Sequence, residues 1–175
     1  MQIRTHMNKQ EFEKLITHIP DFPKVGVTFM DVSPLLKHRF DDVITDMCKN
    51  IDWSNVDYIL GIESRGFILG SAMAIKQNKG FIPVRKKGKL PPPTIGEDYS
   101  LEYGHDTLEM KINKESAKIV IVDDVIATGG TLKATIKLCE RNNFQVQAIS
   151  MLINLRFLNQ LDQEFDNIHS VLNFD

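Results

Sequence analysis

The stretch Ile119-Val-Ile-Val-Asp-Asp-Val-Ile-Ala-Thr-Gly-Gly-Thr131 decides the fold. Its first four residues are apolar and typical of a buried strand, and the small residues after the two acids lead into a helical pattern. Backbone N–H groups at the start of a helix, together with two threonine hydroxyls, favour the binding of one phosphate group. We call the residues concerned the phosphate loop: Ala127, Thr128, Gly129, Gly130 and Thr131. Because ligands bind outside the carboxyl ends of parallel strands, the stretch predicts an α/β sheet with a phosphate site at its edge.

Asp123 and Asp124, directly before this loop, restrict the ligand further. Two carboxylates would repel a bare anion, so the ligand should also offer sugar hydroxyls or a bound cation. A ribose 5-phosphate group meets both demands. The loop lacks the Gly-Lys-Ser/Thr element of a P-loop and the three-glycine spacing of a dinucleotide-binding motif. A strand-to-helix turn capped by Asp and relaxed by Gly is the structural alternative.

The order of strand, turn and helix occurs twice along the chain. A strand over 56–62 precedes a helix over 67–76, and a strand over 118–122 precedes a helix over 131–141. Further strands are predicted over 80–85, 146–155 and 170–174. This alternation predicts an α/β fold with a central parallel sheet flanked by helices.

The N-terminal part predicts two helices joined by a loop. Asn8 and Glu11 form a capping-box pattern, and apolar residues at helical spacing extend the first helix to an end by Pro20. Residues 21–29 are too rich in Pro and Gly for a helix and predict an ordered loop or a short extended piece. A second helix is predicted over 40–51.

Residues 86–107 show no periodicity and contain three consecutive prolines. A compact domain seldom carries a structureless loop of about 20 residues unless the loop works as a lid or a binding element. We therefore predict a flexible lid over about 86–107, with an edge hairpin or a linker as the alternative.

Composition sets the class of protein. A chain of 175 residues with 42% hydrophobic residues is long enough for one globular domain over 1–175. The formal net charge of -2 argues against a nucleic-acid partner, and apolar runs of only strand length argue against a membrane span. Cys48 and Cys139 lie in apolar, helical-looking stretches, so we expect buried thiols and a reducing compartment, the cytoplasm.

The segment Val122-Asp-Asp-Val-Ile-Ala-Thr-Gly-Gly-Thr131 closely resembles the phosphoribosyl pyrophosphate (PRPP) binding motif of the type I phosphoribosyltransferases. Its Ala-Thr-Gly-Gly-Thr form is similar to that of the family members that act on adenine. Further segments match the same subfamily in order: Phe22-Pro-Lys-Val-Gly-Val-Thr-Phe-Met-Asp-Val-Ser-Pro34, Gly61-Ile-Glu-Ser-Arg-Gly-Phe67, and Arg85-Lys-Lys-Gly-Lys-Leu-Pro91 leading to Tyr99-Ser-Leu-Glu-Tyr-Gly104. The resemblance spans about residues 10–155.

The resemblance implies how PRPP binds. Its 5-phosphate would bind to the phosphate loop, and its ribose hydroxyls would lie near Asp123 and Asp124. Mg²⁺ would enter with PRPP and water, close to these acids but with no firm direct protein ligand. The residues implied for pyrophosphate are Glu63, Ser64, Arg65, Arg85 and Lys89. The family often has a cis peptide bond at the position of Glu63–Ser64.

The basic residues could also have ordinary surface roles. Arg65 could form a surface salt bridge, and the charges of 85–89 could belong to a solvated turn. In the family, the counterparts of Arg85 and Lys89 approach pyrophosphate partly from the other subunit, which implies a homodimer.

Residues of about 20–35 correspond to the family's hood over the purine. Phe29 would stack on adenine, with Thr28 and Met30 beside it, although an aromatic ring here could simply be part of the core. Met30 stands where the family usually has Arg, and Val25 stands where Pro is frequent.

In the lid segment, Glu102 resembles the family's catalytic glutamate, which would take the N7 proton of adenine, and Tyr103 resembles a tyrosine that closes over the site. The resemblance thus implies a purine salvage enzyme that converts adenine and PRPP to AMP and pyrophosphate. A phosphoribosyltransferase for xanthine or hypoxanthine, and a non-catalytic PRPP-sensing regulator on the same fold, are the alternatives.

Overall fold

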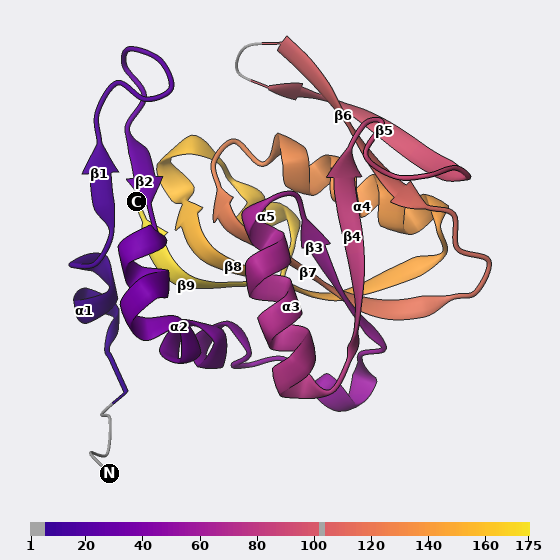
Figure 1. Ribbon diagram of the computed structural model, residues 1–175, viewed down its shortest axis with the longest axis horizontal. Coiled ribbons are helices and arrows are strands. Elements are labelled where there is room, and N and C mark those ends of the chain that lie inside the picture. The colour runs from indigo at the N-terminus through magenta and orange to yellow at the C-terminus, as the bar shows by residue number, and fades with distance from the viewer. Residues whose placement is uncertain (1–5, 102–103) are drawn as a thin grey trace. The chain divides into compact units, whose positions relative to one another are not determined.

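The computed structural model describes residues 6–101 and 104–175 (Figure 1). The described part of the chain divides into two compact units, Met1–Asp46 and Met47–Asp175. The single domain over 1–175 stays a prediction.

Within the described residues, the larger unit is built on a seven-stranded sheet with the order β5-β6-β4-β3-β7-β8-β9. The strands are β3 (Tyr58–Ile62), β4 (Gly80–Lys86), β5 (Thr94–Leu101), β6 (Gly104–Lys111), β7 (Ala117–Ile126), β8 (Phe144–Leu155) and β9 (Ile168–Phe174). The strands β4, β3, β7, β8 and β9 run parallel to one another. β5 and β6 form an antiparallel hairpin, and β6 pairs antiparallel with β4 at the edge of the parallel strands. This confirms the predicted α/β fold with a central parallel sheet.

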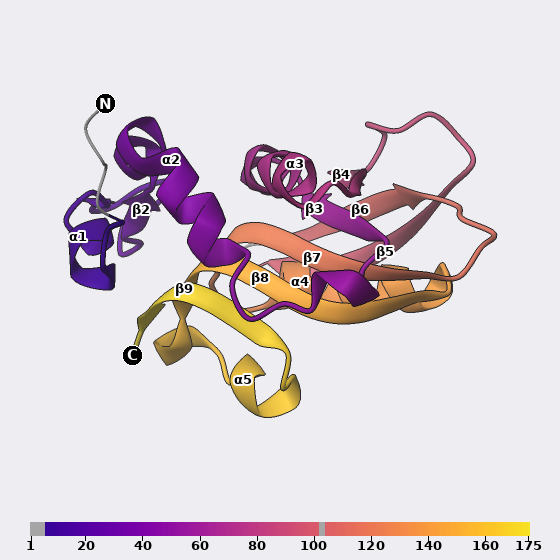
Figure 2. The same ribbon diagram turned by 90° about the horizontal axis from the view of Figure 1, so that it is seen from below.

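Two long helices cover opposite faces of the sheet (Figure 2). The chain leaves β3 through α3 (Arg65–Gln77) toward β4, and leaves β7 through α4 (Gly130–Arg141) toward β8. These crossovers run in opposite directions along the sheet, and right-handed crossovers therefore put α3 and α4 on opposite faces. The remaining helical elements of this unit are η1 (Trp53–Asn55), η2 (Arg156–Leu158) and α5 (Leu161–Glu164). No helix among the described residues has both the length and the apolar character needed to cross a bilayer.

The core lies around β7. Residues Ile119 to Val122 are fully buried on both faces, as expected for an inner strand of a parallel sheet, and α4 adds Leu138 and Cys139. Cys48 and Cys139 are both buried and free, as predicted. Burial raises the pKa of the Cys139 thiol to about 12, so at neutral pH this thiol is protonated and acts as a packing group.

The segment 86–107 contains β5 and the first half of β6, which form a hairpin that pairs in register from Thr94 and Lys111 to Leu101 and Gly104. The edge hairpin, one of the alternatives, is thus what the structure has there. The sequence hides it because polar residues such as Glu97 and Asp106 stand among the inward positions, where they pair with charges outside the hairpin. Motion of the hairpin as a lid stays a prediction.

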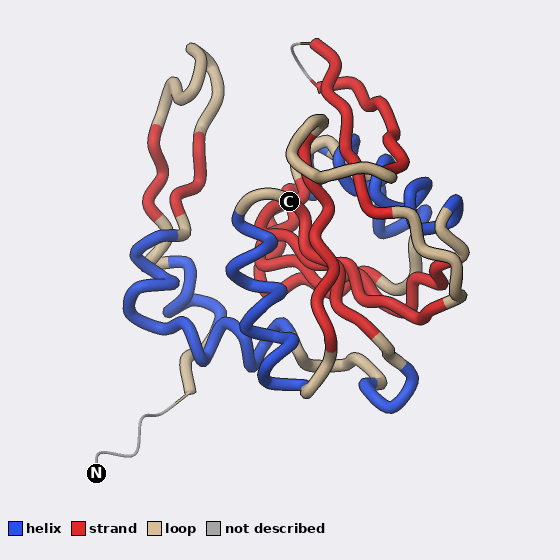
Figure 3. The backbone as a smooth tube through the Cα atoms, turned by 45° about the vertical axis from the view of Figure 1, so that its right-hand side comes forward, coloured by secondary structure: helices blue, strands red, loops and turns tan. Residues whose placement is uncertain are grey.

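The smaller unit begins with α1 (Lys9–Glu13), and the capping box of Asn8 and Glu11 is present as predicted. The prediction that this helix continues to Ile19 is wrong. Instead, β1 (Thr17–Ile19) pairs antiparallel with β2 (Phe29–Asp31), and the ladder overrides the helical spacing (Figure 3). The loop between these strands is ordered, with the Phe22 amide donating to the carbonyl of Val27 at 3.1 Å.

The second helix, α2 (Ser33–Met47), begins earlier and ends earlier than the predicted 40–51. Pro34 lies in its first turn, where a helix tolerates proline because no N–H is needed there. Arg39 has non-helical angles (φ -140°, ψ 33°) and kinks the helix at that point.

Candidate active site

The predicted site lies where the strand order changes direction. β3 and β7 are parallel neighbours, so the residues that follow them meet at the same edge of the sheet. Their helices leave toward opposite faces, which makes this edge a topological switch point, the usual ligand site of open α/β sheets. It brings Glu63, Ser64 and Arg65, which follow β3, next to the acids near the end of β7 and the phosphate loop that follows β7.

The phosphate loop turns sharply from β7 into α4. Gly129 is the N-cap of α4 with φ +85°, a left-handed conformation that favours glycine. The first backbone N–H groups of a helix have no partner within it, and the dipole attracts anions, so the loop can hold a phosphate group. Binding of the 5-phosphate by this loop stays a prediction.

Two residues that the sequence did not reveal support the phosphate loop, one through a hydrogen bond and one through packing. The Asn159 amide donates to the carbonyl oxygen of Ala127 at 2.8 Å. Leu161 packs against Gly129 so tightly that a Cβ atom on this glycine would overlap its side chain. Both residues come about 30 positions after the loop, in a stretch without any motif, so no sequence signal pointed to them.

The two acids are held close to α3. Asp124 is 5% exposed, and its Oδ2 atom meets Arg65 Nε at 2.6 Å as an ion pair, with no well-aligned hydrogen bond from the described residues. Asp123 Oδ1 accepts a hydrogen bond from the Asp124 amide at 2.9 Å. A Cβ atom on Gly66 would lie 2.6 Å from the Val122 carbonyl oxygen, so only glycine lets α3 approach β7 this closely. Burial, and next the charge of Asp124, raise the pKa of Asp123 well above its usual range.

We expect Asp123→Asn to change how stability depends on pH. A carboxyl whose pKa is higher in the folded state than in the unfolded state stabilises the fold at low pH, and this contribution is lost as the pH rises through the folded pKa. The variant lacks this loss, so its free energy of unfolding should rise relative to wild type as the pH rises from about 4, the ordinary pKa of an Asp carboxyl, to neutral. Urea unfolding across this range measures the difference. Asp98→Asn on the hairpin is the control, and parallel curves for wild type and Asp123→Asn would contradict the expectation.

The residues after β3 form a charged cluster with the end of β4. The Glu63 carboxylate receives hydrogen bonds from Arg85 Nε at 3.3 Å and Nη2 at 3.4 Å, and from the Lys86 amide at 2.9 Å. Burial alone would raise the pKa of Glu63, but these bonds and the charges of Arg85 and Lys89 outweigh it and lower the pKa. Arg85 Nη1 also donates to the Lys89 carbonyl oxygen at 3.2 Å. An ionised Glu63 thus orders the basic turn.

The peptide bond between Glu63 and Ser64 is cis, as the family resemblance implied. Ser64 is the N-cap of α3, so the first turn of α3 begins at Arg65. Binding of pyrophosphate by these residues stays a prediction.

The remaining predicted residues lie elsewhere. Phe29 and Met30 belong to β2 in the smaller unit, with exposed Thr28 just before them, and the Phe29 ring meets Phe22 edge to face at 5.2 Å. Glu102 and Tyr103 lie outside the described residues. The binding of adenine by Phe29, Thr28 and Met30 stays a prediction. The catalytic role of Glu102 and the closing of Tyr103 over the site stay predictions as well.

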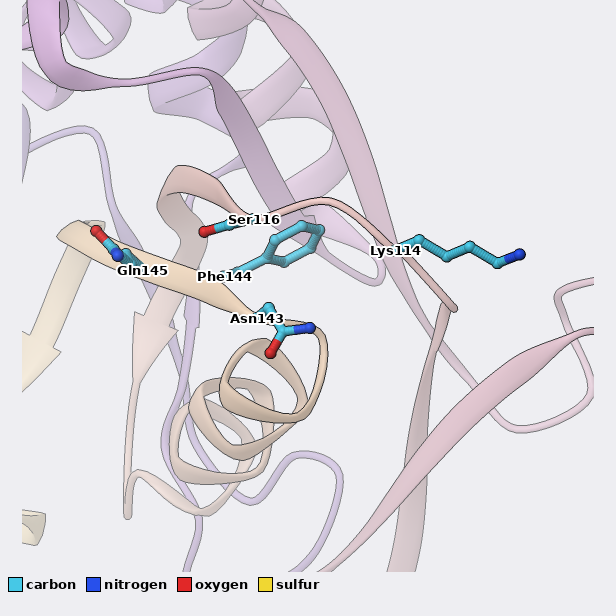
Figure 4. Close-up of a pocket in the computed structure, with 5 residues that line it drawn as sticks. All are labelled: Lys114, Ser116, Asn143, Phe144 and Gln145. Atoms are coloured by element: carbon cyan, nitrogen blue, oxygen red, sulfur yellow. The ribbon is translucent and has the colours of Figure 1, made fainter.

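A pocket of about 480 Å³ opens at the other end of the sheet (Figure 4). Its lining residues are Lys114, Ser116, Asn143, Phe144 and Gln145, which lie at the amino ends of β7 and β8. Figure 4 shows the Lys114 side chain directed away from the Phe144 ring. The pocket is therefore separate from the predicted site at the carboxyl ends.

Comparison with known proteins shows the family to which the chain belongs. The family model of the phosphoribosyl transferase domain matches residues 32–156, which run from just before α2 to the start of η2 and include the whole switch point. The chain belongs to the phosphoribosyltransferase family.

The most similar relatives define the branch of the family. The adenine phosphoribosyltransferase of Bdellovibrio bacteriovorus is 45% identical over 166 residues, 94% of this chain and 99% of the relative. That of Brachyspira hyodysenteriae is 50% identical over 153 residues, 85% and 90% of the two chains. The solved structure of the Rhodothermus marinus enzyme matches with a TM-score of 0.86 and 41% identity over 95% of this chain and 98% of its own. Within the family, the chain belongs with the adenine phosphoribosyltransferases.

Proposed function

We propose that the chain transfers the 5-phosphoribosyl group of PRPP to adenine, giving AMP and pyrophosphate in purine salvage. The observation that carries the proposal is the acidic pair beside a helix N-terminus at the switch point between β3 and β7. The phosphate loop suits the 5-phosphate, and the carboxylates of Asp123 and Asp124 suit the ribose hydroxyls. A yeast relative, 32% identical with a TM-score of 0.86 over 94% of this chain and 98% of its own, has been solved with adenine.

The chemistry assigned to the residues follows from the charges that develop. As pyrophosphate leaves, positive charge grows on C1 of the ribose and negative charge on the leaving group. Arg65, Arg85 and Lys89 would stabilise the leaving group, and these interactions accelerate the reaction only if they strengthen in the transition state. Adenine would attack through N9 from the opposite face, with Phe29 stacked on its ring and Glu102 accepting the N7 proton.

We propose that Mg²⁺ enters with PRPP, held by PRPP oxygens and by water. The fit is chemical: Asp124 offers a buried carboxylate oxygen without a well-aligned donor from the described residues, and Mg²⁺ prefers oxygen ligands. The described residues contain no cluster of three or more His, Cys, Asp or Glu side chains that could hold a metal. When bound, the ion would neutralise charge on the diphosphate.

Base choice tests the proposal directly. With PRPP and magnesium, adenine should form nucleotide far faster than hypoxanthine or guanine, because a buried site that pairs with one base edge leaves groups unpaired against another. The assay follows nucleotide formation with each purine base in turn. Equal use of adenine and hypoxanthine would favour the alternative base assignment, and binding of PRPP without turnover of any base would favour a regulator.

We also propose a homodimer. On α3, Ile68 and Ile75 lie on the same face, 52% and 84% exposed, and an exposed apolar stripe of this kind favours a protein contact. Ile75→Arg should shift the protein toward the monomer in sedimentation velocity, because burying the new charge is unfavourable. Ile112→Arg, at a residue 46% exposed outside any helix, is the matched control and should leave the sedimentation coefficient unchanged. Unchanged sedimentation of Ile75→Arg would exclude this face.

A cytoplasmic location is the remaining proposal. Its support is the pair of buried, unpaired thiols of Cys48 and Cys139, which suits a reducing compartment. Cell fractionation followed by detection of the protein tests it.

A further inference from the structure

The side-chain amide of Asn159 joins the phosphate loop to the end of β8. Asn159 lies between η2 and α5, and its Nδ2 atom donates to the carbonyl oxygens of Ala127 and Leu155, both at 2.8 Å. A third acceptor, Asn154 Oδ1, lies 3.1 Å from the same nitrogen, and the Leu161 amide donates to Asn159 Oδ1 at 3.1 Å. A carboxamide has two N–H donors and one oxygen acceptor, so only this orientation of the amide gives each group a matching partner.

A second layer of polar side chains holds Asn159 in place. Asn154 is fully buried and lies opposite Ile126, the last residue of β7, in the β7–β8 register. Its own Nδ2 atom donates to Asp162 Oδ1 at 3.2 Å, and Asp162 Oδ2 meets Arg156 Nε at 2.7 Å. The Asn154 oxygen is thereby left to face Asn159. Asn159 thus acts as the last member of an ordered network that ends on the phosphate loop.

The bond to Ala127 sets the direction of the next backbone N–H group. The cis peptide bonds of the described chain lie elsewhere, so the bond between Ala127 and Thr128 is trans. In a planar trans peptide, the carbonyl group and the following N–H group point in opposite directions. Because Asn159 holds the Ala127 carbonyl, the Thr128 N–H points away from Asn159. This N–H has no backbone acceptor within the described part of the chain.

The side of the loop that faces Asn159 is filled by protein, and the other side is open. Leu161, 1% exposed, packs against Gly129 where a Cβ atom would otherwise lie. Thr128 is exposed. The Thr128 N–H is therefore directed toward the side from which a phosphate group can approach.

We propose that Asn159 is a positioning residue for the 5-phosphate: by holding the Ala127 carbonyl, it turns the Thr128 N–H toward the phosphate. The inference rests on the proposed function, because it takes the phosphate loop as the site of the 5-phosphate. Without the side-chain amide, the peptide could rotate and present the Ala127 oxygen to the ligand. A phosphate dianion only accepts hydrogen bonds, so this rotation would remove one donor and add a repulsive contact.

Asn159→Leu tests the role, because leucine has a similar branched shape but can neither donate nor accept a hydrogen bond. With ribose 5-phosphate as the probe in calorimetry, the variant should bind about 10-fold more weakly than wild type. This is the lower end of the range for one hydrogen bond to a charged group, because a released peptide still samples the wild-type orientation. A variant that had only lost stability would bind with lower stoichiometry at an unchanged Kd.

Asn142→Leu is the matched control. Asn142 is 1% exposed at the C-terminal end of α4, opposite to the phosphate loop. Its side chain also bridges two backbone groups, donating to the Lys111 carbonyl oxygen at 3.0 Å and accepting from the Asn113 amide at 3.0 Å. Both variants leave these backbone groups unpaired and should lower the melting temperature, but only Asn159→Leu should raise the Kd. An unchanged Kd in Asn159→Leu, or an equal rise in Asn142→Leu, would overturn the role.

Asn159→Asp decides the question if Asn159→Leu does not fold. Aspartate keeps the shape and still accepts from the Leu161 amide, but its carboxylate cannot donate to Ala127. Its Kd for ribose 5-phosphate should exceed that of wild type by about 10-fold or more, the range for a lost bond to a charged group. The difference should persist at about 1 M salt, where repulsion between the new charge and the phosphate is screened. A difference that vanishes at high salt would overturn the role.

AMP formation from adenine and PRPP separates this inference from the proposed function. If wild type makes AMP but the folded Asn159 variants bind ribose 5-phosphate as wild type does, the positioning role is wrong and the proposed function stands. If wild type neither binds ribose 5-phosphate nor makes AMP, both are wrong.

Discussion

In a single turnover, Glu102→Gln is expected to form AMP about 10²- to 10⁴-fold more slowly than wild type, the usual contribution of a general base. Gln has nearly the same shape and can still hydrogen-bond, but it cannot accept the N7 proton of adenine. PRPP binding should therefore remain while the chemical step slows. Single-turnover formation of AMP is the right measurement, because product release can limit steady-state turnover and hide part of the loss.

The control for this variant is Glu97→Gln, the same change on β5. Glu97 pairs with half-exposed cations on α4, and pairs of this kind contribute little, so its single-turnover rate should stay near wild type. If Glu102→Gln also stays within about threefold of wild type, far from the range of a lost general base, another group or water takes the proton.

Arg65→Met is expected to lower both stability and PRPP use. Removing one partner of a fully buried ion pair destabilises a protein by about 3–5 kcal/mol, because the other charge is left unpaired. Arg65 is 35% exposed and Asp124 is 8% exposed at the side chain, so we expect the lower end, about 3 kcal/mol. Urea unfolding measures this loss, and the KM for PRPP should rise because a cation for pyrophosphate is gone.

A double variant separates these two effects. Arg65→Met with Asp124→Asn removes the unpaired carboxylate, so most of the lost stability should return while PRPP use stays poor. Arg141→Met breaks a half-exposed pair and should change stability by at most about 1 kcal/mol. If Arg65→Met alone keeps both wild-type stability and wild-type KM, the ion pair is incidental and Arg65 does not bind pyrophosphate.

The fold could be predicted best where the sequence pattern of a segment agrees with the environment of that segment in the folded protein. The apolar run from Ile119 to Val122 is buried on both faces of the sheet, so its sequence pattern and its environment agree. Ile19 shows the opposite case, because its helical spacing with Phe12 and Ile16 gave way to pairing with Phe29 in β2. The sequence could not decide between a lid, an edge hairpin and a linker for the segment that forms the hairpin of 94–111. The inward polar residues of this hairpin find partners that only the folded chain supplies.

The candidate site divides in the same way. The phosphate loop and the acids are contiguous, so the sequence predicted them as one site, and the structure brings them to the switch point. The Arg65–Asp124 ion pair joins residues 59 positions apart, and no sequence pattern in either segment predicts it.

The support of the phosphate loop by Asn159 and Leu161 bears on how much of the chain an active protein needs. The family model ends at residue 156, before both of these residues, although every recognisable motif precedes that point. A truncation there would keep every motif yet remove the Asn159 bond to Ala127 and the Leu161 side chain that packs on Gly129. Proteolytic nicking or a stop codon shortly after residue 156 should therefore abolish PRPP binding, and the minimal functional fragment is longer than the segment that the family model matches.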